Sequence, residues 1–146
     1  MTDSLYSIFY TDDDTDDQEV FKEIVGEINE TIDIFTQSNG EELLGALENP
    51  PPSPHVVFLD LNMPVKNGYD ALKEIKTSDK LKNLPVIVFS TSNDRNSIEL
   101  TRKLGATLYI NKPTSYSELK QILGHVLTID WKTFKADGKD FVFSMQ

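Results

Sequence analysis

Five short, mostly apolar runs are spaced along the 146-residue chain, and each is bounded by polar or turn-forming residues. Apolar runs of this length are typical of strands that are buried on both faces of a sheet. The pattern predicts strands at residues 7–11, 32–35, 56–59, 86–89 and 108–110.

Between these runs, apolar side chains recur at the spacing of amphipathic helices. The stripe is clear in the first and last segments, which carry Val20, Phe21, Ile24, Val25 and Ile28, and Leu119, Ile122, Leu123, Val126 and Leu127. Thr15 and Gln18 have the spacing of a capping box at the start of the first helix. Turns at Asn39-Gly40 and Asn67-Gly68 precede two more helices. The fourth, at about 94–104, has a weak stripe that leaves Leu100 off its main face.

Strand and helix therefore alternate five times over about residues 4–128. Such alternation predicts an α/β fold with a doubly wound, five-stranded parallel sheet, covered on both faces and joined by right-handed crossovers. We expect one domain at residues 1–128 and an extension at 129–146. The proline-rich segment 50–54 is expected to be a stiff surface connector.

The extension is rich in aromatic residues for its length, with Trp131, Phe134, Phe141 and Phe143. Its Asp-Gly pair within residues 136–139 is a hairpin signal, so residues 134–135 and 141–143 are candidate hairpin arms. Exposed aromatic residues at this density are expected to pack on the domain or on a partner. We expect the extension either to dock on the fifth helix or to build a dimer.

Composition narrows the class of protein further. The net charge of −10 and the pI near 4.5 disfavour nucleic acid as a partner, because a phosphate backbone attracts an excess of Lys and Arg. The chain has no cysteine, which excludes disulfides and thiolate metal sites. No signal peptide or membrane-length apolar stretch is visible, so we expect a cytoplasmic protein without a membrane partner.

Reactive polar residues follow four of the predicted strands. Asp12 and Asp13 follow the first, Asp60 the third, Ser90 the fourth, and Lys112 the fifth. The carboxyl ends of parallel strands share one edge of a sheet, which is where open α/β sheets place their sites. Carboxylates suit Mg²⁺, the hydroxyl and the ammonium suit phosphoryl oxygens, and a carboxylate can itself form an acyl phosphate.

Each of these residues also has an ordinary structural explanation. Asp14, Asp16 and Asp17 sit where a helix start favours negative charge, and we assign them that role. Asp60 alone could be a turn former, and the hydroxyls after the fourth strand could cap a helix. Lys112 is expected to pair with Asp60, and a cis Lys112-Pro113 bond is a candidate device for aiming it. The four strand ends together favour the functional interpretation.

These residues resemble the receiver domain of two-component response regulators over roughly residues 4–127. The motifs that carry the resemblance are the acidic pair Asp12-Asp13, the segment 59–64 around Asp60, Gly68, the hydroxyl of Ser90, Lys112-Pro113, and Tyr109 three residues before the lysine. The resemblance implies a (βα)5 flavodoxin-like fold. It also implies a single-domain regulator that is a signalling switch rather than an enzyme.

The family mechanism would make Asp60 the acceptor of a phosphoryl group from a histidine kinase or phosphotransfer protein. Mg²⁺, or Mn²⁺ in its place, would be bound by Asp13, Asp60 and the main-chain carbonyl of Asn62, with Asp12 acting through water. Ser90 and Lys112 would then bind the phosphoryl group, and Tyr109 would swing inward. The face built from the fourth helix, fifth strand and fifth helix would change, altering binding of a downstream protein or of a second copy.

Some positions depart from the commoner family pattern. Thr91 is larger than the usual residue after the switch hydroxyl, and Asn62 and Ser92 flank the path of an attacking water. We expect these three residues to tune dephosphorylation. The aromatic extension resembles that of stand-alone receivers associated with phytochrome-type kinases.

Three alternatives remain open from the sequence. A degenerate receiver could be a docking scaffold that works without phosphorylation. A haloacid-dehalogenase-like phosphatase would need an acid two residues after its nucleophile, where this chain has Asn62. A flavodoxin-like cofactor binder would need an anion-friendly loop after the first strand, where this chain has five aspartates within residues 12–17.

Overall fold

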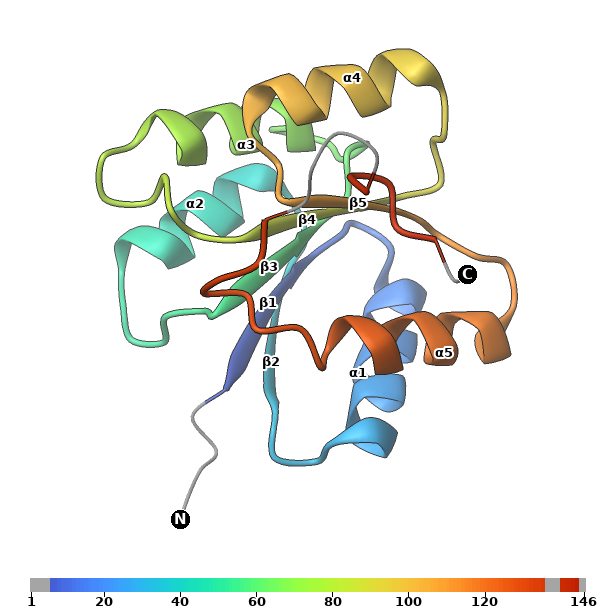
Figure 1. Ribbon diagram of the computed structural model, residues 1–146. Helices are drawn as coiled ribbons and strands as arrows, with labels where there is room; N and C mark the ends of the chain where they lie inside the picture. The colour runs from blue at the N-terminus through green and yellow to red at the C-terminus, as the bar shows by residue number, and fades with distance from the viewer. Residues whose placement is uncertain (1–5, 136–139, 145–146) are drawn as a thin grey trace.

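The computed structural model describes residues 6–135 and 140–144. The five strands form one parallel sheet in the order β2-β1-β3-β4-β5 (Figure 1). They are β1 (Ser7–Thr11), β2 (Asp33–Gln37), β3 (Val56–Leu59), β4 (Val86–Ser90) and β5 (Leu108–Asn111). The predicted doubly wound, flavodoxin-like (βα)5 fold is confirmed. The second strand lies slightly later than predicted, and its alternating exposure reflects its place at the sheet edge.

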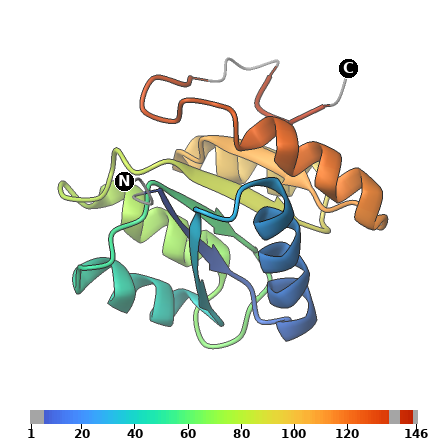
Figure 2. The same ribbon diagram turned by 90° about the horizontal axis from the view of Figure 1, so that it is seen from below.

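Five helices cover the two faces of the sheet. They are α1 (Thr15–Ile28), α2 (Gly40–Glu48), α3 (Gly68–Thr77), α4 (Arg95–Leu104) and α5 (Tyr116–Val126). Figures 1 and 2 show α1 and α5 side by side on one face and α2, α3 and α4 on the other. Each face encloses its own apolar cluster, so both sides of the central strands are buried as their composition predicts.

Each helix begins after a polar residue whose side chain accepts backbone N–H groups of the first turn. These residues are Asp14, Asn39, Asn67, Asp94 and Ser115. The predicted capping box of Thr15 and Gln18 is wrong, because Asp14 is the cap of α1. The side chain of Gln18 is instead buried and donates to the carbonyl of Asp12.

The weak apolar stripe of α4 also has a structural cause. Its buried residues are Ser97 and Thr101, and the Thr101 hydroxyl donates to the Ser97 carbonyl within the helix. Leu100 is exposed, as its place off the stripe predicts. The face of α4 that packs on the domain is therefore partly polar.

The C-terminal extension packs along the outer edge of β5. The N–H of Tyr109 donates to the carbonyl of Phe141, and the N–H of Phe143 donates to the carbonyl of Tyr109. Trp131 and Phe134 join the apolar cluster of the α1–α5 face. The predicted turn at 136–139 lies outside the described residues. Of the candidate hairpin arms, residues 141–143 pair with β5 through a parallel bridge between Val142 and Tyr109.

Within residues 6–135 and 140–144, no helix is both long enough and apolar enough to cross a membrane.

Candidate functional site

Three carboxylates meet at the carboxyl edge of the sheet. Asp12 and Asp13 follow β1, and Asp60 follows the neighbouring strand β3. The N–H of Asp60 donates to the carbonyl of Thr11, at the end of β1. One oxygen from each of the three side chains lies within 4.8 Å of the others. Asp12 and Asp60 are buried, whereas Asp13 is exposed. Parallel pairing of the two strands therefore creates the predicted acidic cluster.

Asp12 is the most fully bonded of the three. Its Oδ2 accepts from the hydroxyl of Tyr10 at 2.9 Å and from Nζ of Lys112 at 2.6 Å. Its Oδ1 accepts from the N–H of Asp14 at 3.0 Å. Burial, followed by the charge of Asp12, raises the pKa of Tyr10, so this phenol remains a donor. The sequence gives no sign that Tyr10 bonds Asp12, because this tyrosine lies within an apolar strand.

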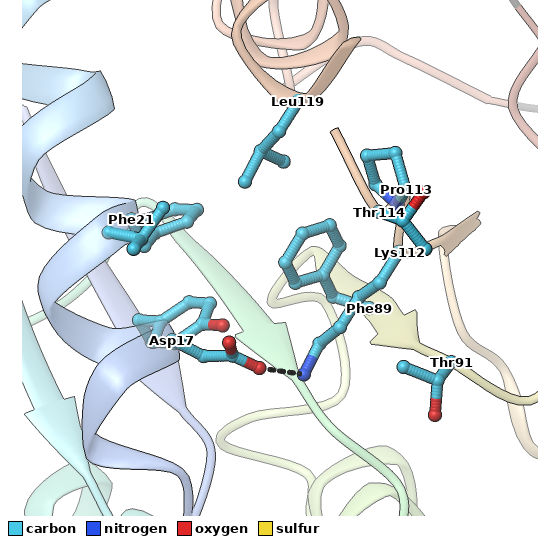
Figure 3. A pocket seen from close by; sticks show the side chains of 10 residues that line it. Asp17, Phe21, Phe89, Thr91, Lys112, Pro113, Thr114 and Leu119 are labelled. Carbon is cyan, nitrogen blue, oxygen red and sulfur yellow. Dashed lines mark hydrogen bonds and ion pairs between the residues drawn. The ribbon is translucent and has the colours of Figure 1, made fainter. Parts of the chain in front are cut away.

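Lys112 lies between two aspartates, and neither of them is the predicted partner. Its Nζ is 2.6 Å from Asp12 and 3.0 Å from Asp17. The expected ion pair between Lys112 and Asp60 is therefore not present in this conformation, although the lysine is close enough to act on the charge of Asp60. Figure 3 shows the side chains of Asp17, from α1, and Lys112 pointing toward one another. Asp17, first assigned only to the helix start, is thus part of the site.

The backbone around Lys112 also differs from expectation. In the described part of the chain, cis peptide bonds occur at Pro50-Pro51 and Pro51-Pro52, and the Lys112-Pro113 bond is not among them. The prediction of a cis bond there is wrong. The lysine is held instead by its own N–H, which donates to the carbonyl of Ser90 at 2.8 Å.

Asp60 lies in a pocket that disfavours its charged form. Burial raises the pKa of Asp60 to about 6; the charge of Lys112 opposes that shift, while the charges of Asp12 and Asp13 add to it. One carboxylate oxygen accepts from the N–H of Leu61 at 2.9 Å. A cation placed among these carboxylates would relieve their mutual repulsion. The hard oxygen ligands present suit a divalent cation.

The loop after Asp60 is tightly folded against the site. The N–H of Gly68 donates to the carbonyl of Leu61, and a Cβ at Gly68 would lie 2.2 Å from the carbonyl oxygen of Asp60. Val65 has a φ of 66°, and the N–H of Lys66 closes a three-residue turn on the carbonyl of Pro64. A β-branched residue is strained at positive φ. The loop thus stores strain beside the carboxylates.

The hydroxyl side of the site comes from β4 and the loop after it. Ser90 is fully buried, and its Oγ accepts from the N–H of Ser92 at 3.1 Å. The amide of Asn62 lies 3.4 Å from the hydroxyl of Ser92, so the two residues expected to flank the water path are neighbours. Thr91 is exposed and lines a cavity beside Lys112.

Tyr109 connects the site to the extension. Its ring is fully buried, and its hydroxyl donates to the carbonyl of Ser92. On its other side, the ring of Phe141 lies 6.2 Å away between centroids. The side chain at the expected switch position therefore contacts both the loop after β4 and the extension.

Comparison with known proteins agrees with this geometry. The family model of the response regulator receiver domain matches residues 8–124. Response regulator Rcp1 of Synechocystis sp. is 35% identical over 85 residues, which are 58% of this chain and 54% of that protein. The probable C4-dicarboxylate response regulator DctR of Bacillus subtilis is 33% identical over 118 residues, which are 81% of this chain and 50% of that protein. The chain thus spans about half the length of these two relatives.

Solved structures show the same fold. The phosphorylated cyanobacterial phytochrome response regulator RcpA superposes with a TM-score of 0.77 at 30% identity, covering 83% of this chain and 90% of that chain. The response regulator RPA3017, from red light signalling of R. palustris, gives a TM-score of 0.80 at 20% identity, covering 90% of this chain and 99% of that chain. At that lower identity the second match concerns the fold alone.

Proposed function

This chain belongs to the response regulator receiver domain family, and we propose that it is a phosphorylation switch of a two-component system with Asp60 as its acceptor. The observation that carries the proposal is the cluster of Asp12, Asp13 and Asp60 beside the ammonium of Lys112. Such a cluster can hold a cation and a phosphoryl group together. We propose a switch that modifies itself and does not turn over a separate substrate.

The transfer step follows from the chemistry of Asp60. One carboxylate oxygen attacks the phosphorus of a phosphohistidine on a sensor kinase or phosphotransfer protein. The new O–P bond forms as the P–N bond breaks, and its electron pair leaves with the imidazole nitrogen. The product is an acyl phosphate on Asp60.

The acidic residues would hold the metal. We propose Asp13, Asp60 and the main-chain carbonyl of Asn62 as direct ligands, with Asp12 acting through water because Tyr10, Lys112 and the N–H of Asp14 already bond its oxygens. Mg²⁺, or Mn²⁺ in its place, would offset the repulsion between Asp60 and the incoming phosphoryl oxygens.

Ser90 and Lys112 would bind the phosphoryl group after its transfer to Asp60. The Ser90 hydroxyl would donate to a phosphoryl oxygen, and the Lys112 ammonium would turn from Asp17 toward the phosphoryl group. Because Tyr109 is already buried on the carbonyl of Ser92, phosphorylation would strengthen an arrangement that this conformation contains. Movement of that loop would alter the surface of α4, β5 and α5 for a downstream protein or a second copy.

A cavity beside Lys112 supports approach of the donor from the α1–α5 side. It has a volume of about 320 Å³, and Figure 3 shows Phe21, Phe89 and Leu119 around it, next to the lysine. An apolar side chain of the donor could fill this cavity while its phosphohistidine reaches Asp60. We place the kinase or phosphotransfer protein on this face.

The test is intact mass after incubation with acetyl phosphate, with and without Mg²⁺. We expect the wild type to gain one phosphoryl group only with Mg²⁺, and Asp60→Asn to gain none. Asp16→Asn, on the exposed start of α1, is a matched control that should behave as the wild type. No gain in the wild type, together with no binding of beryllofluoride, would favour the docking scaffold instead. Sustained hydrolysis of a phosphate ester would favour the phosphatase.

A further inference from the structure

A second pocket lies at the opposite end of the sheet from Asp60. Its volume is about 720 Å³, within the range of small-molecule sites. It is formed by Tyr6 before β1, His55 before β3, Leu84 and Pro85 before β4, and residues 129–132 of the extension. None of these residues takes part in the proposed phosphoryl transfer, so the pocket needs an explanation of its own.

Flat rings form much of the wall. The rings of Tyr6 and His55 are stacked, with centroids 5.0 Å apart and planes inclined by 19°. Trp131 is 6% exposed and packs edge-on against Phe134, with ring centroids 5.0 Å apart. Aromatic walls of this kind favour a planar ligand that stacks against them.

Two buried polar atoms on these rings have no hydrogen-bond partner. Across the described part of the chain, the hydroxyl of Tyr6 and Nε1 of Trp131 are the side-chain atoms in this condition. Burying a donor without a partner costs roughly 1–3 kcal/mol, so such atoms are rare in native proteins. Both residues line this pocket, although the two atoms themselves are closed to solvent, so a group that reached them from the pocket would satisfy two unpaired donors.

The polar groups around the pocket are mostly donors. The N–H of Ser7 donates to Nδ1 of His55 at 3.0 Å, so Nε2 of the neutral ring carries the proton. The Trp131 indole can only donate, and the Lys132 side chain adds a positive charge. Asp130 also lines the pocket, and its carboxylate accepts from the N–H of Lys132. This carboxylate, in a chain of net charge −10, disfavours an anionic ligand.

We propose that this pocket binds an uncharged planar heterocycle with ring-nitrogen or carbonyl acceptors, of the size of a nucleobase to a nucleoside. The ring stacks on the aromatic wall, and its acceptors take hydrogen bonds from Tyr6 and Trp131. Both donor atoms are closed to solvent in this conformation, so the hydrogen bonds form only after the pocket wall around Tyr6 and Trp131 opens.

The single tryptophan of the chain makes the test direct. In a ¹H–¹⁵N correlation spectrum of the ¹⁵N-labelled full chain, the indole N–H of Trp131 gives one resolved signal. Adenosine and riboflavin serve as the acceptor-bearing probes, and toluene as an aromatic probe without acceptors. We expect saturable downfield movement of the indole signal with at least one acceptor-bearing probe, and a much smaller response to toluene.

Variants separate the hydrogen bond from the packing. Tyr6→Phe keeps the ring and removes the hydroxyl, and we expect it to weaken probe binding roughly tenfold. Tyr116→Phe makes the same chemical change on exposed α5 and should bind as the wild type. Asp60→Asn should also bind as the wild type, which keeps this result separate from the phosphoryl-transfer test. An indole signal unmoved by millimolar adenosine and riboflavin, or equal affinity in Tyr6→Phe, would overturn the proposal.

Discussion

Gly68 packs against the backbone of Asp60, the proposed acceptor, and replacing this glycine with alanine tests how closely the fold and that residue are coupled. The new Cβ would lie 2.2 Å from the carbonyl oxygen of Asp60 and 2.8 Å from Cα of Leu61. Both contacts are with backbone atoms, which cannot rotate out of the way as a flexible side chain can. Since carbon atoms pack at about 3.5 Å or more, the 2.8 Å contact alone requires the start of α3 and the backbone of residues 60–61 to separate by roughly 0.7 Å.

The size of the effect follows from two opposing terms. Overpacking of this kind costs about 1–3 kcal/mol. Alanine in a helix gains back about 0.5–1 kcal/mol relative to glycine. The net loss of about 1–2 kcal/mol corresponds, for a chain of 146 residues, to a fall in Tm of roughly 5 °C.

The assay is thermal unfolding of three proteins under identical conditions, followed by acetyl phosphate labelling. Gly124→Ala in α5 is the matched control, because a Cβ there would meet nothing within 4 Å. We expect the control to melt about 2–3 °C above the wild type and to accept phosphoryl groups normally. Gly68→Ala should melt lower and label more slowly, since the carbonyl of Asp60 is displaced. If Gly68→Ala instead melts as high as the control, Gly68 does not lie this close to the backbone of Asp60.

Two further substitutions and one deletion test other parts of the structure. Lys112→Ala leaves the 2%-exposed side chain of Asp12 without its cation, so the free energy of unfolding, measured with denaturant in the absence of metal, should fall by about 3 kcal/mol. Millimolar Mg²⁺ should restore it, and a loss that Mg²⁺ does not change would contradict the charge argument. Val65→Gly should raise the free energy of unfolding by about 1 kcal/mol, because Val65 is 76% exposed and strained at positive φ. A decrease would show that contacts of the Val65 side chain stabilise the fold by more than the backbone strain destabilises it. Deleting residues 131–146 should lower Tm by several degrees, because Trp131 and Phe141 are buried on the domain; calorimetry with light scattering measures Tm and mass, and no change in either would refute the docked extension.

The strands and the acidic cluster were predictable because they depend on short-range patterns and on one topological rule. Apolar runs determine which segments are buried, and parallel pairing brings Asp12, Asp13 and Asp60 to one edge. The motif residues on which the family resemblance rests were recognisable as well, because a motif is also a short-range pattern. No knowledge of side-chain conformation is needed for any of these steps.

The partners of Lys112 could not be predicted in the same way. The choice among Asp12, Asp17 and Asp60 depends on where α1 begins and on how far the lysine reaches, both of which are fixed only by packing. Asp17 lies in the first turn of α1 whether Asp14 or Thr15 is the cap, so its position along the helix does not by itself show that Lys112 reaches it.

The extension shows a different limit of local patterns. Asp-Gly favours a hairpin, but residues 141–143 lie beside the open edge of β5, where the backbone of Tyr109 offers both a donor and an acceptor. Pairing with a strand already held in a sheet requires less ordering than forming an isolated two-stranded hairpin, which is marginal in water. The nearest turn signal in the sequence therefore does not decide which strand is the partner.

The hydrogen bonds of the three carboxylates suit them to different roles at the proposed site. Asp12 is buried, and its oxygens are bonded by Tyr10, Lys112 and the N–H of Asp14, so it is satisfied before any cation arrives. Asp13 is exposed and lines a cavity of about 400 Å³ with Asn62. Among the described residues the carboxylate of Asp60 accepts only the N–H of Leu61, and burial raises its pKa, so its buried charge is only partly compensated. At the proposed site a cation would gain most by binding Asp13 and Asp60, which would leave Asp12 to fix Lys112 beside the proposed acceptor.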